Sequence, residues 1–333
     1  VEGGWQGLQH PTGFGGQGLP KTIGAACGEM LNSANMSFAL CPLLSDGAIE
    51  ALLTAGSPEQ QATYIPKMIA GEWTGSMNLT EPHCGTDLGL IKTKADPNGD
   101  GSYKISGTKI FISAGEHDLT DNIIHLVLAK IPGPDGKLIP GTRGISLFIV
   151  PKKLVGINGE LTGIRNDVAL AGLNHKLGWR GTTNTLLNFG EGKFPVNGEA
   201  GAVGYLVGKP HEGLRCMFHM MNEARIGVGT AATMLGMAGY YASLDYAKNR
   251  PQGRPVGPGG KDPAQPQIRI IEHADVKRML LAQKAYCEGA LALELYCARL
   301  VDEHHTAQAQ AADDARLLLE VLTPIAKSWP SEW

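Results

Sequence analysis

The chain has 333 residues, of which 18% are charged, and a formal net charge of −3. This length suffices for two or three domains with a sizeable buried core. The balanced charge gives no sign of the basic surface that binds nucleic acid, so no polyanionic partner is expected.

The first quarter of the chain has a helical pattern. Residues 1–24 form a glycine-rich loop, and we expect helices over residues 30–40 and 46–55. A further helix is expected to begin after Ser57, because Ser is a good N-cap and Pro58 suits the first helical position.

Residues 76–200 have β character instead. Turn-forming clusters, the clearest at 96–101 and 132–136, separate short runs of β-type residues. This spacing predicts an antiparallel sheet or barrel and not βαβ units. The expected strands lie at residues 103–105, 109–112, 123–130, 144–151 and 183–189.

The helical period returns over residues 213–249. A Pro- and Gly-rich connector at 251–266 follows, then a helix over 273–304 and a last helical segment from about Asp313. The apolar stripe at i, i+3, i+4 and i+7 is formed by Leu214, Met217, Phe218 and Met221.

The order of helices, β-strands and helices predicts an α+β multidomain fold. We expect an N-terminal helical domain at 1–75, a middle β domain at 76–208 and a C-terminal helical bundle at 209–333.

Two features bear on the cellular compartment. The six cysteines show neither C-x-x-C spacing nor a dense framework, so we expect reduced thiols in a cytoplasmic protein. The uncharged stretch 226–242 is short and only weakly apolar. It predicts a buried bundle helix, and no membrane span is expected.

Three patterns imitate known sites. Residues 13–18 match G-x-G-x-x-G, but no β-strand leads into them, as a dinucleotide site requires. Residues 96–101 imitate an EF-hand loop, yet its twelfth position is Gly107, so a tight hairpin is expected. Residues 302–305 (D-E-H-H) are expected to be a solvated helix end, because adjacent helical side chains diverge by roughly 100°.

The most informative stretch is 77–88, M-N-L-T-E-P-H-C-G-T-D-L. Pro82 holds the residue before it extended, and Gly85 permits a backbone path that other residues resist. With the hydroxyls of Thr80 and Thr86, such a loop presents hydrogen-bond donors outward. Donors fixed in this way suit a planar, electron-rich heterocycle that gains negative charge.

The same loop closely resembles the T-E-P-x-x-G-[ST]-D signature of the acyl-CoA dehydrogenase family, where it lies along the isoalloxazine ring of FAD. A second segment, 107–115, resembles the family's strand whose aromatic residue covers one flavin face and whose next Ser or Thr bonds near the reactive nitrogen. Phe111 stands where the family more often has Trp, so the flat apolar cover is kept without the N–H. The FAD contacts implied in these segments are Met77, Leu79, Thr80, Gly85, Thr86, Phe111 and Ser113.

Two further segments carry the resemblance into the C-terminal part. Arg225 matches a helix arginine beside the acyl-CoA cleft, and Asn222, one turn earlier, matches a position that contacts CoA. Arg250 and Gln252 match the R-x-x-F-G segment that reaches the FAD of a neighbouring subunit, although its Phe is missing here. The substrate contacts implied are Thr86, Phe218, Met221, Asn222 and Arg225.

Residues 83–95, 112–118 and 177–184, and the long connector after Arg250, resemble the branch that contains 3-methylmercaptopropionyl-CoA dehydrogenases. The resemblance implies FAD-dependent α,β-dehydrogenation of an acyl-CoA to the 2-enoyl-CoA. In this branch the reaction converts 3-methylmercaptopropionyl-CoA to methylthioacryloyl-CoA, in dimethylsulfoniopropionate metabolism. It also implies a homodimer or homotetramer that passes electrons to an electron-transfer flavoprotein.

The resemblance places the catalytic base elsewhere. Most members use a Glu near the C-terminus, and a minority use one directly before the matching arginine, where this chain has Ala224. Glu223 points roughly 100° away from that direction, so it is not expected to be the base. We therefore expect the chain to be a fragment cut at both ends, with no catalytic residue of its own and the base beyond Trp333.

Two other functions stay open on the sequence. A flavin acyl-CoA oxidase would use the same site and admit O₂ to the reduced flavin. A non-catalytic family member would keep the fold to bind acyl-CoA or a partner.

Overall fold

The computed structural model describes residues 2–332, apart from the side chains of His219, Asn222 and Glu223. The chain forms two compact units. Unit 1 consists of Val1–Pro20 and Met36–Ala224, and unit 2 of Lys21–Asn35 and Arg225–Trp333. Helices α1 (Lys21–Ala55) and α3 (Gly213–Asn249) each contribute to both units.

One kinked helix, α1, replaces the two helices expected at 30–40 and 46–55. It bends at Asn35, which has φ −156° and ψ 84°, and it runs on through Pro42. The predicted break near Pro42 is wrong, because the turns that follow this proline are buried and tertiary packing outweighs the lost helical hydrogen bond. Helix α2 (Pro58–Ile69) begins as predicted, with a reciprocal capping box between Ser57 and Gln60.

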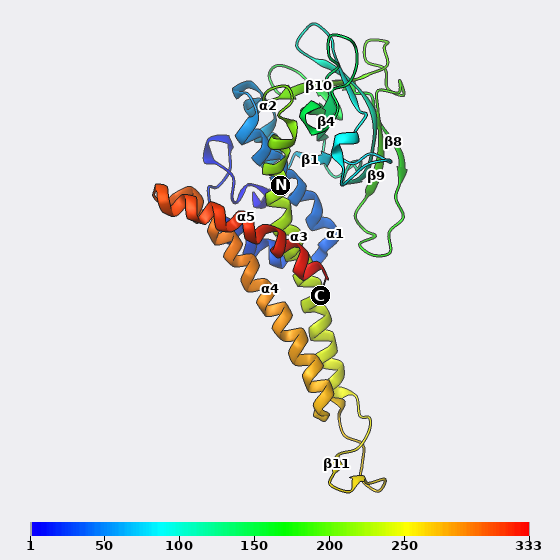
Figure 1. Ribbon diagram of the computed structural model, residues 1–333, viewed down its shortest axis with the longest axis vertical. Coiled ribbons are helices and arrows are strands. Elements are labelled where there is room, and N and C mark those ends of the chain that lie inside the picture. The colour runs from blue at the N-terminus through cyan, green and yellow to red at the C-terminus, as the bar shows by residue number, and fades with distance from the viewer. Residues whose placement is uncertain (1, 333) are drawn as a thin grey trace. The chain divides into compact units, whose positions relative to one another are not determined.

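The main sheet of unit 1 has the strand order β1-β4-β5-β10-β3-β9-β8, and β2 pairs with β3 and β4. Figure 1 labels β1, β4, β8, β9 and β10 of this sheet. Most pairs are antiparallel, as predicted, but β1 runs parallel to β4, with Trp73 opposite Asn122. The strands are β1 Trp73–Asn78, β2 Lys94–Pro97, β3 Tyr103–Ser113, β4 Asn122–Lys130, β5 Ile145–Pro151, β8 Val168–Leu173, β9 Asn184–Phe189 and β10 Ala202–Val207. A two-stranded ribbon pairs β6 (Lys153–Val155) with β7 (Leu161–Arg165).

Strand β3 joins two strands that were expected to be separate. Gly107 lies between the two expected ranges, and its φ of 151° lets the strand continue past Thr93. A Cβ at this position would stand 2.5 Å from Thr93 Oγ1, so only glycine fits.

Strand β4 is buried along its whole length and contributes to two cores of unit 1. Ile124 and Leu126 pack with apolar residues of α1 and α2 in the first core. Val127, on the opposite face, packs with Phe148 and Phe189 in the second. The sheet is therefore held rigidly on both faces, and its β1 edge carries the loop after Asn78.

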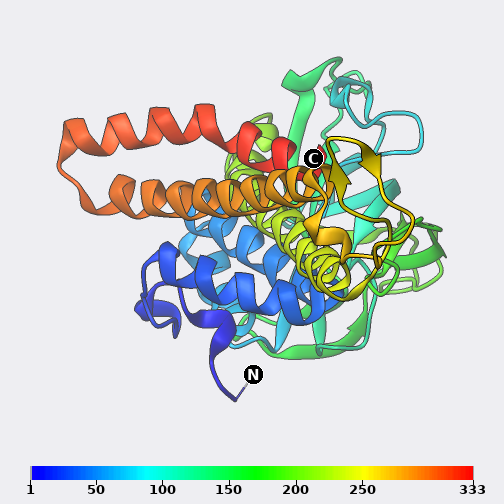
Figure 2. The same ribbon diagram turned by 90° about the horizontal axis from the view of Figure 1, so that it is seen from below.

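Unit 2 is built on α3, α4 (Ala274–Thr306) and α5 (Ala309–Glu332), which agree with the three predicted helical segments. Helices α4 and α5 lie side by side (Figure 2). The connector between α3 and α4 holds the short strands β11 (Val256–Gly257) and β12 (Gly260–Lys261). The short 3₁₀ turns of the chain are η1 Trp5–Gly7, η2 Thr12–Phe14, η3 Leu88–Leu90, η4 Thr142–Gly144 and η5 Ile270–Glu272.

Within the described residues, α1 alone is long and apolar enough to cross a membrane by length and composition. More than half of its apolar window, 56%, is buried in the folded chain, as in the core helix of a soluble protein. The expectation that the protein has no membrane span stays a prediction.

Candidate functional site

The loop after β1 closes as a tight turn in unit 1. Glu81 N–H donates to Cys84 O at 2.9 Å, and Cys84 N–H donates to Glu81 O at 3.0 Å. The two residues at the tip of the turn are exposed. Among the described residues, the backbone N–H groups of Gly85 and Thr86 find no acceptor, so both are available to a ligand.

The Glu81 carboxylate anchors this turn from beneath and is only 4% exposed. It accepts from Lys92 N–H at 2.7 Å, from Thr93 N–H at 3.0 Å and Oγ1 at 2.6 Å, and from Lys109 Nζ at 2.9 Å. Burial alone would raise the pKa of Glu81, but the Lys109 charge and these hydrogen bonds outweigh it and lower the pKa. Glu81 is therefore ionised, and its hydrogen bonds hold the loop in place.

Lys109, on β3, is fully buried and was not among the predicted site residues. Its Nζ donates to Glu81 Oε1 and also to Leu79 O at 2.9 Å. Burial lowers the pKa of Lys109 to about 8, against the raising effect of Glu81, so the side chain is still mostly protonated at pH 7. The available signal was a lysine inside an apolar β run, which needs a buried counter-charge.

Strand β3 bulges directly after this lysine. Its register with β9 shifts between Lys109 and Ile112, and Phe111 has a left-handed φ of 61°. The bulge turns the Phe111 ring outward, where it is 62% exposed, while the neighbouring Ile112 is buried. Ile110 N–H donates to Thr80 O at 3.0 Å, so the bulge lies beside the loop.

The remaining predicted contacts of this loop and strand lie in the same unit. Met77 and Leu79 are partly buried against the first core. Ser113 is partly buried, and its Oγ lies 3.5 Å from Asn184 Nδ2. The structure thus joins an exposed aromatic ring, hydroxyls and free backbone donors, a set that suits one face and one edge of a flat, electron-rich ring system.

The predicted substrate contacts are divided between the units. Phe218, 41% exposed, and Met221, partly buried against the first core, lie with Thr86 in unit 1. Arg225 begins the part of α3 that belongs to unit 2. The side chain of Asn222 lies outside the described residues.

Arg250 and Gln252 lie in unit 2, at the start of the connector. Ile270 N–H donates to Arg250 O and Gln252 N–H to Ile268 O, both at 2.9 Å, so this segment is a short backbone ladder. Their proposed reach to the FAD of a neighbouring subunit stays a prediction.

The three imitations of known sites resolve into ordinary structure, with one correction. Residues 12–14 form η2, and the 96–101 stretch is the hairpin between β2 and β3. Asp302 is no free surface group: its carboxylate accepts from Lys21 N–H at 2.6 Å and Thr22 N–H at 3.0 Å, at the start of α1.

One group of potential metal ligands occurs in the described part of the chain: Glu81, His83 and Cys84. The carboxylate of Glu81 is already saturated by four donors, and burial raises the pKa of the Cys84 thiol. We assign no metal to it.

Comparison with known proteins identifies this arrangement. The model of the acyl-CoA dehydrogenase N-terminal domain matches residues 1–72, and that of the middle domain matches residues 76–190. The chain belongs to the acyl-CoA dehydrogenase family. The loop and the bulged strand both lie within the middle-domain match.

The relatives that this family member matches are longer proteins. The chain is 46% identical to the 3-methylmercaptopropionyl-CoA dehydrogenase of Ruegeria pomeroyi, over 100% of its own length and 53% of the relative. It is 36% identical to a broad-specificity linear acyl-CoA dehydrogenase of Mycobacterium tuberculosis, over 100% of its own length and 53% of that relative. The crystal structure of an acyl-CoA dehydrogenase complexed with FAD from Bacillus anthracis has the same fold, with a TM-score of 0.76 and 23% identity. The match covers 99% of this chain and 52% of the Bacillus anthracis chain. The chain thus spans about half the length of these relatives.

Proposed function

We propose that the protein to which this chain belongs is an FAD-dependent acyl-CoA dehydrogenase that forms the 2-enoyl-CoA from a short acyl-CoA thioester. The observation that carries the proposal is the outward-turned Phe111 beside a loop with free backbone donors. The relation to the Ruegeria pomeroyi enzyme supports 3-methylmercaptopropionyl-CoA as the substrate and dimethylsulfoniopropionate metabolism as the setting.

The residues of unit 1 fit FAD. Phe111 would cover one face of the flavin ring, and the N–H groups of Gly85 and Thr86 would bind its polar edge. Thr80 and Ser113 add hydroxyls on the two adjoining segments. Gly85 does not have a left-handed φ, so the expected special backbone path is wrong; a Cβ there would make only a tight contact of 3.2 Å with the Thr80 methyl.

FAD, when bound, accepts the hydride that leaves the substrate β-carbon. The chain's own part is to hold the thioester and the flavin in a dry site, where hydrogen bonds polarise the carbonyl and acidify the α-proton. Phe218, Met221, Asn222 and Arg225 are the proposed substrate contacts on α3. No residue of this chain is assigned as the proton-abstracting base, and Glu223 is not proposed in that role.

The same proposal extends to the compartment, the oligomeric state and the electron acceptor of the protein. We place the protein in the cytoplasm; within the described residues all six cysteines are free thiols, which is consistent with a reducing compartment. Arg250 and Gln252 would reach the FAD of a neighbouring subunit in a homodimer or homotetramer. An electron-transfer flavoprotein would reoxidise the enzyme.

The test is anaerobic titration of the full-length protein with 3-methylmercaptopropionyl-CoA and butyryl-CoA, followed by the flavin absorbance. We expect bleaching within the mixing time for at least one thioester and slow reoxidation by air. Rapid reoxidation by air would indicate an oxidase. A flavin that binds but is never bleached would contradict the proposal and leave a non-catalytic acyl-CoA-binding protein.

A further inference from the structure

The two segments that would hold the flavin are tied by one buried side chain. Lys109 is 0% exposed, and its Nζ donates to Leu79 O and to Glu81 Oε1, each at 2.9 Å. Leu79 and Glu81 flank Thr80 in the loop, while Lys109 lies two residues before Phe111 on β3. A single ammonium group therefore donates hydrogen bonds to the loop on both sides of Thr80.

Because of the bulge, these two hydrogen bonds matter for the position of Phe111 relative to the loop. Because the register of β3 shifts directly after Lys109, regular pairing with β9 does not fix Phe111. The links that the bulge makes toward the loop are the Ile110 N–H bond to Thr80 O and the two bonds of Lys109 Nζ. Within the described residues, loss of the ammonium would leave the Ile110 N–H bond to Thr80 O as the direct hydrogen bond between the bulge and the loop.

We propose that Lys109 is a positioning residue that sets the register between the flavin-binding loop and the Phe111 bulge. The proposal rests on the proposed FAD site and adds a residue that does not touch the cofactor.

A matched control is available in Lys130. This lysine is also buried, at 3% exposure, and its Nζ donates to a loop carbonyl, Gly89 O, at 2.7 Å. It lies on β4 and holds η3 instead of the segment around Thr80. Lys130→Met therefore removes the same kind of bond but leaves both bonds of Lys109 Nζ in place, although the Lys130 charge also acts on Glu81 and Asp87.

The experiment measures FAD dissociation, the visible flavin spectrum and apoprotein stability in the full-length protein. We expect Lys109→Met to weaken FAD binding about tenfold or more and to shift the flavin band, whereas Lys130→Met leaves both near wild type at a similar loss of stability. In Glu81→Gln/Lys109→Met, removal of both charges should restore stability but not FAD affinity.

Equal FAD affinities for Lys109→Met and Lys130→Met at equal stability would overturn this inference alone. Restoration of FAD affinity in the double variant would also overturn it, because the charge balance and not the register would then matter. A wild-type protein that binds no FAD would overturn the proposed function as well.

A second and independent observation concerns unit 2. The Glu294 carboxyl of α4 is 1% exposed, and within the described chain neither of its oxygens has a hydrogen-bond partner. Gly229 of α3 makes room for it, since a Cβ there would stand 2.2 Å from Glu294 Oε1 and 2.5 Å from Ala326 O of α5. The carboxyl and the Ala326 carbonyl thus face the same small space.

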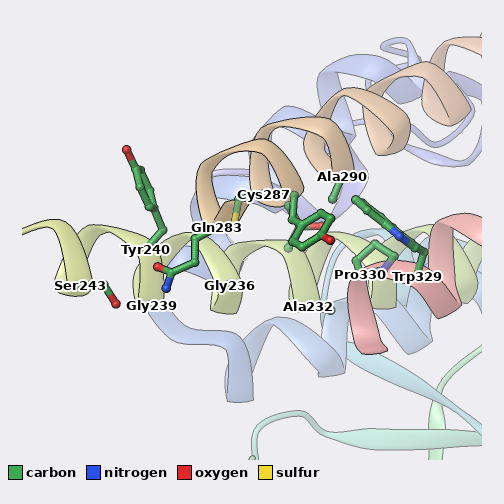
Figure 3. A pocket seen from close by; sticks show the side chains of 12 residues that line it. Ala232, Gly236, Gly239, Tyr240, Ser243, Gln283, Cys287, Ala290, Trp329 and Pro330 are labelled. Carbon is green, nitrogen blue, oxygen red and sulfur yellow. The ribbon is translucent and has the colours of Figure 1, made fainter. Parts of the chain in front are cut away.

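The Ala326 carbonyl is itself short of a partner. In a regular α-helix it would accept from the N–H four residues on, but that residue is Pro330, which has none. Pro330 and Ala290, one turn before Glu294, both line an adjacent pocket of about 220 Å³ (Figure 3). The space beside the carboxyl is therefore bounded by α3, α4 and α5.

We infer that the Glu294 carboxyl is protonated and that its O–H donates a hydrogen bond to Ala326 O. This bond holds α5 against α4 at the place where Gly229 of α3 leaves room for the carboxyl. The surrounding core is apolar: Ile226, Leu293, Cys297, Val301, Leu319, Leu322 and Ala326. The nearest charged residues along α3 and α5 are Arg225 and Lys327, and on α4 the Cys297 thiol is the titratable neighbour. Burial raises the pKa of Glu294 to about 8.

The test is a double-mutant cycle with Pro330→Ala, which returns an N–H to the Ala326 carbonyl. In the wild-type background, Glu294→Gln keeps a donor and should fold with an equilibrium constant about tenfold above that of Glu294→Met. With Pro330→Ala present, the two should differ by less than about threefold. An unchanged difference would overturn the inference.

An infrared measurement serves if a variant fails to fold. The wild-type difference spectrum between pH 6 and pH 9 should contain a protonated carboxyl C=O band that Glu294→Gln lacks. Absence of that band from the wild type would overturn the inference in the same way.

Discussion

Phe111 combines an uncommon backbone conformation with an exposed apolar ring. A φ of 61° costs a non-glycine residue roughly 1 kcal/mol or more, and a 62% exposed ring regains little of it by burial. Stability does not explain the residue, whereas the proposed contact with the flavin ring would. Such strain persists where the surrounding structure holds it for function.

Phe111→Gly separates the two roles. Glycine accepts this φ without strain, so we expect the free energy of unfolding to stay within about 1 kcal/mol of wild type while FAD affinity falls at least about tenfold. Ala114, at φ 50°, is the control, because Ala114→Gly changes a residue with the same backbone strain but no ring. Chemical denaturation and flavin fluorescence measure the two quantities; parallel losses in both would contradict the assignment.

At the scale of single residues, the sequence predicted the residues of the motifs but not the buried residues that hold them in place. Thr80, Gly85, Phe111 and Ser113 came from a local signature, and the structure joins their two segments in one unit. Lys109 was missed, because its role depends on a partner 28 positions away, and separation in sequence gives no contact. The kind of site could be predicted; the buried charge that orders it could not.

The ends of helices are likewise predictable where local residues decide them and unpredictable where tertiary packing decides them. Ser57 and Pro58 begin α2 as predicted, because a capping box is decided within four residues. The single helix α1 was predicted as two, with a gap at residues 41–45 that contains Pro42. Burial of the turns around it, a tertiary effect, decided the outcome.

The start of α1 depends on a residue far along the chain. Pro20 stands at the N-cap position and makes no side-chain cap, and the Asp302 carboxylate takes its place. It accepts from Lys21 N–H, from Thr22 N–H and from Thr22 Oγ1, the last at 2.6 Å. A carboxylate at a helix N-terminus satisfies free donors and complements the helix dipole.

Asp302→Ala should therefore lower the free energy of unfolding by about 1–2 kcal/mol, the usual cost of a lost cap. Asp302→Asn keeps an acceptor oxygen and should lose less. The neighbouring Glu303→Ala removes only an exposed pair with Arg299 and should cost under about 1 kcal/mol. Urea denaturation of the three variants checks the order, and equal losses for Asp302→Ala and Glu303→Ala would contradict it.

At the scale of the whole molecule, the two units carry buried titratable groups of opposite sign. In unit 1, His125 is fully buried and donates to or accepts from Ser76 Oγ at 2.7 Å. Burial, with smaller effects from nearby cations, lowers its pKa to about 3, so the ring is neutral when folded. In unit 2, burial raises the pKa of Glu294 to about 8, so its carboxyl is also neutral when folded.

These shifts predict opposite pH dependences. The stability that unit 1 owes to a neutral His125 is complete above the ordinary histidine pKa of 6.5 and is lost as pH falls toward 3. The stability that unit 2 owes to a protonated Glu294 is complete below the ordinary pKa of 4.5 and is lost as pH rises through 8. Acid should loosen the sheet, and mild alkali should loosen the helices.

Hydrogen exchange read by mass spectrometry resolves the units without separating them. Between pH 5 and pH 8.5, after correction for the intrinsic exchange rate, protection of α4 peptides should fall while protection of β4 peptides is retained or rises. Glu294→Gln cannot ionise, so it should flatten the α4 profile and leave β4 unchanged. If α4 and β4 lost protection together in the wild type, the units would be opening as one body, and the buried groups would not set their separate stabilities.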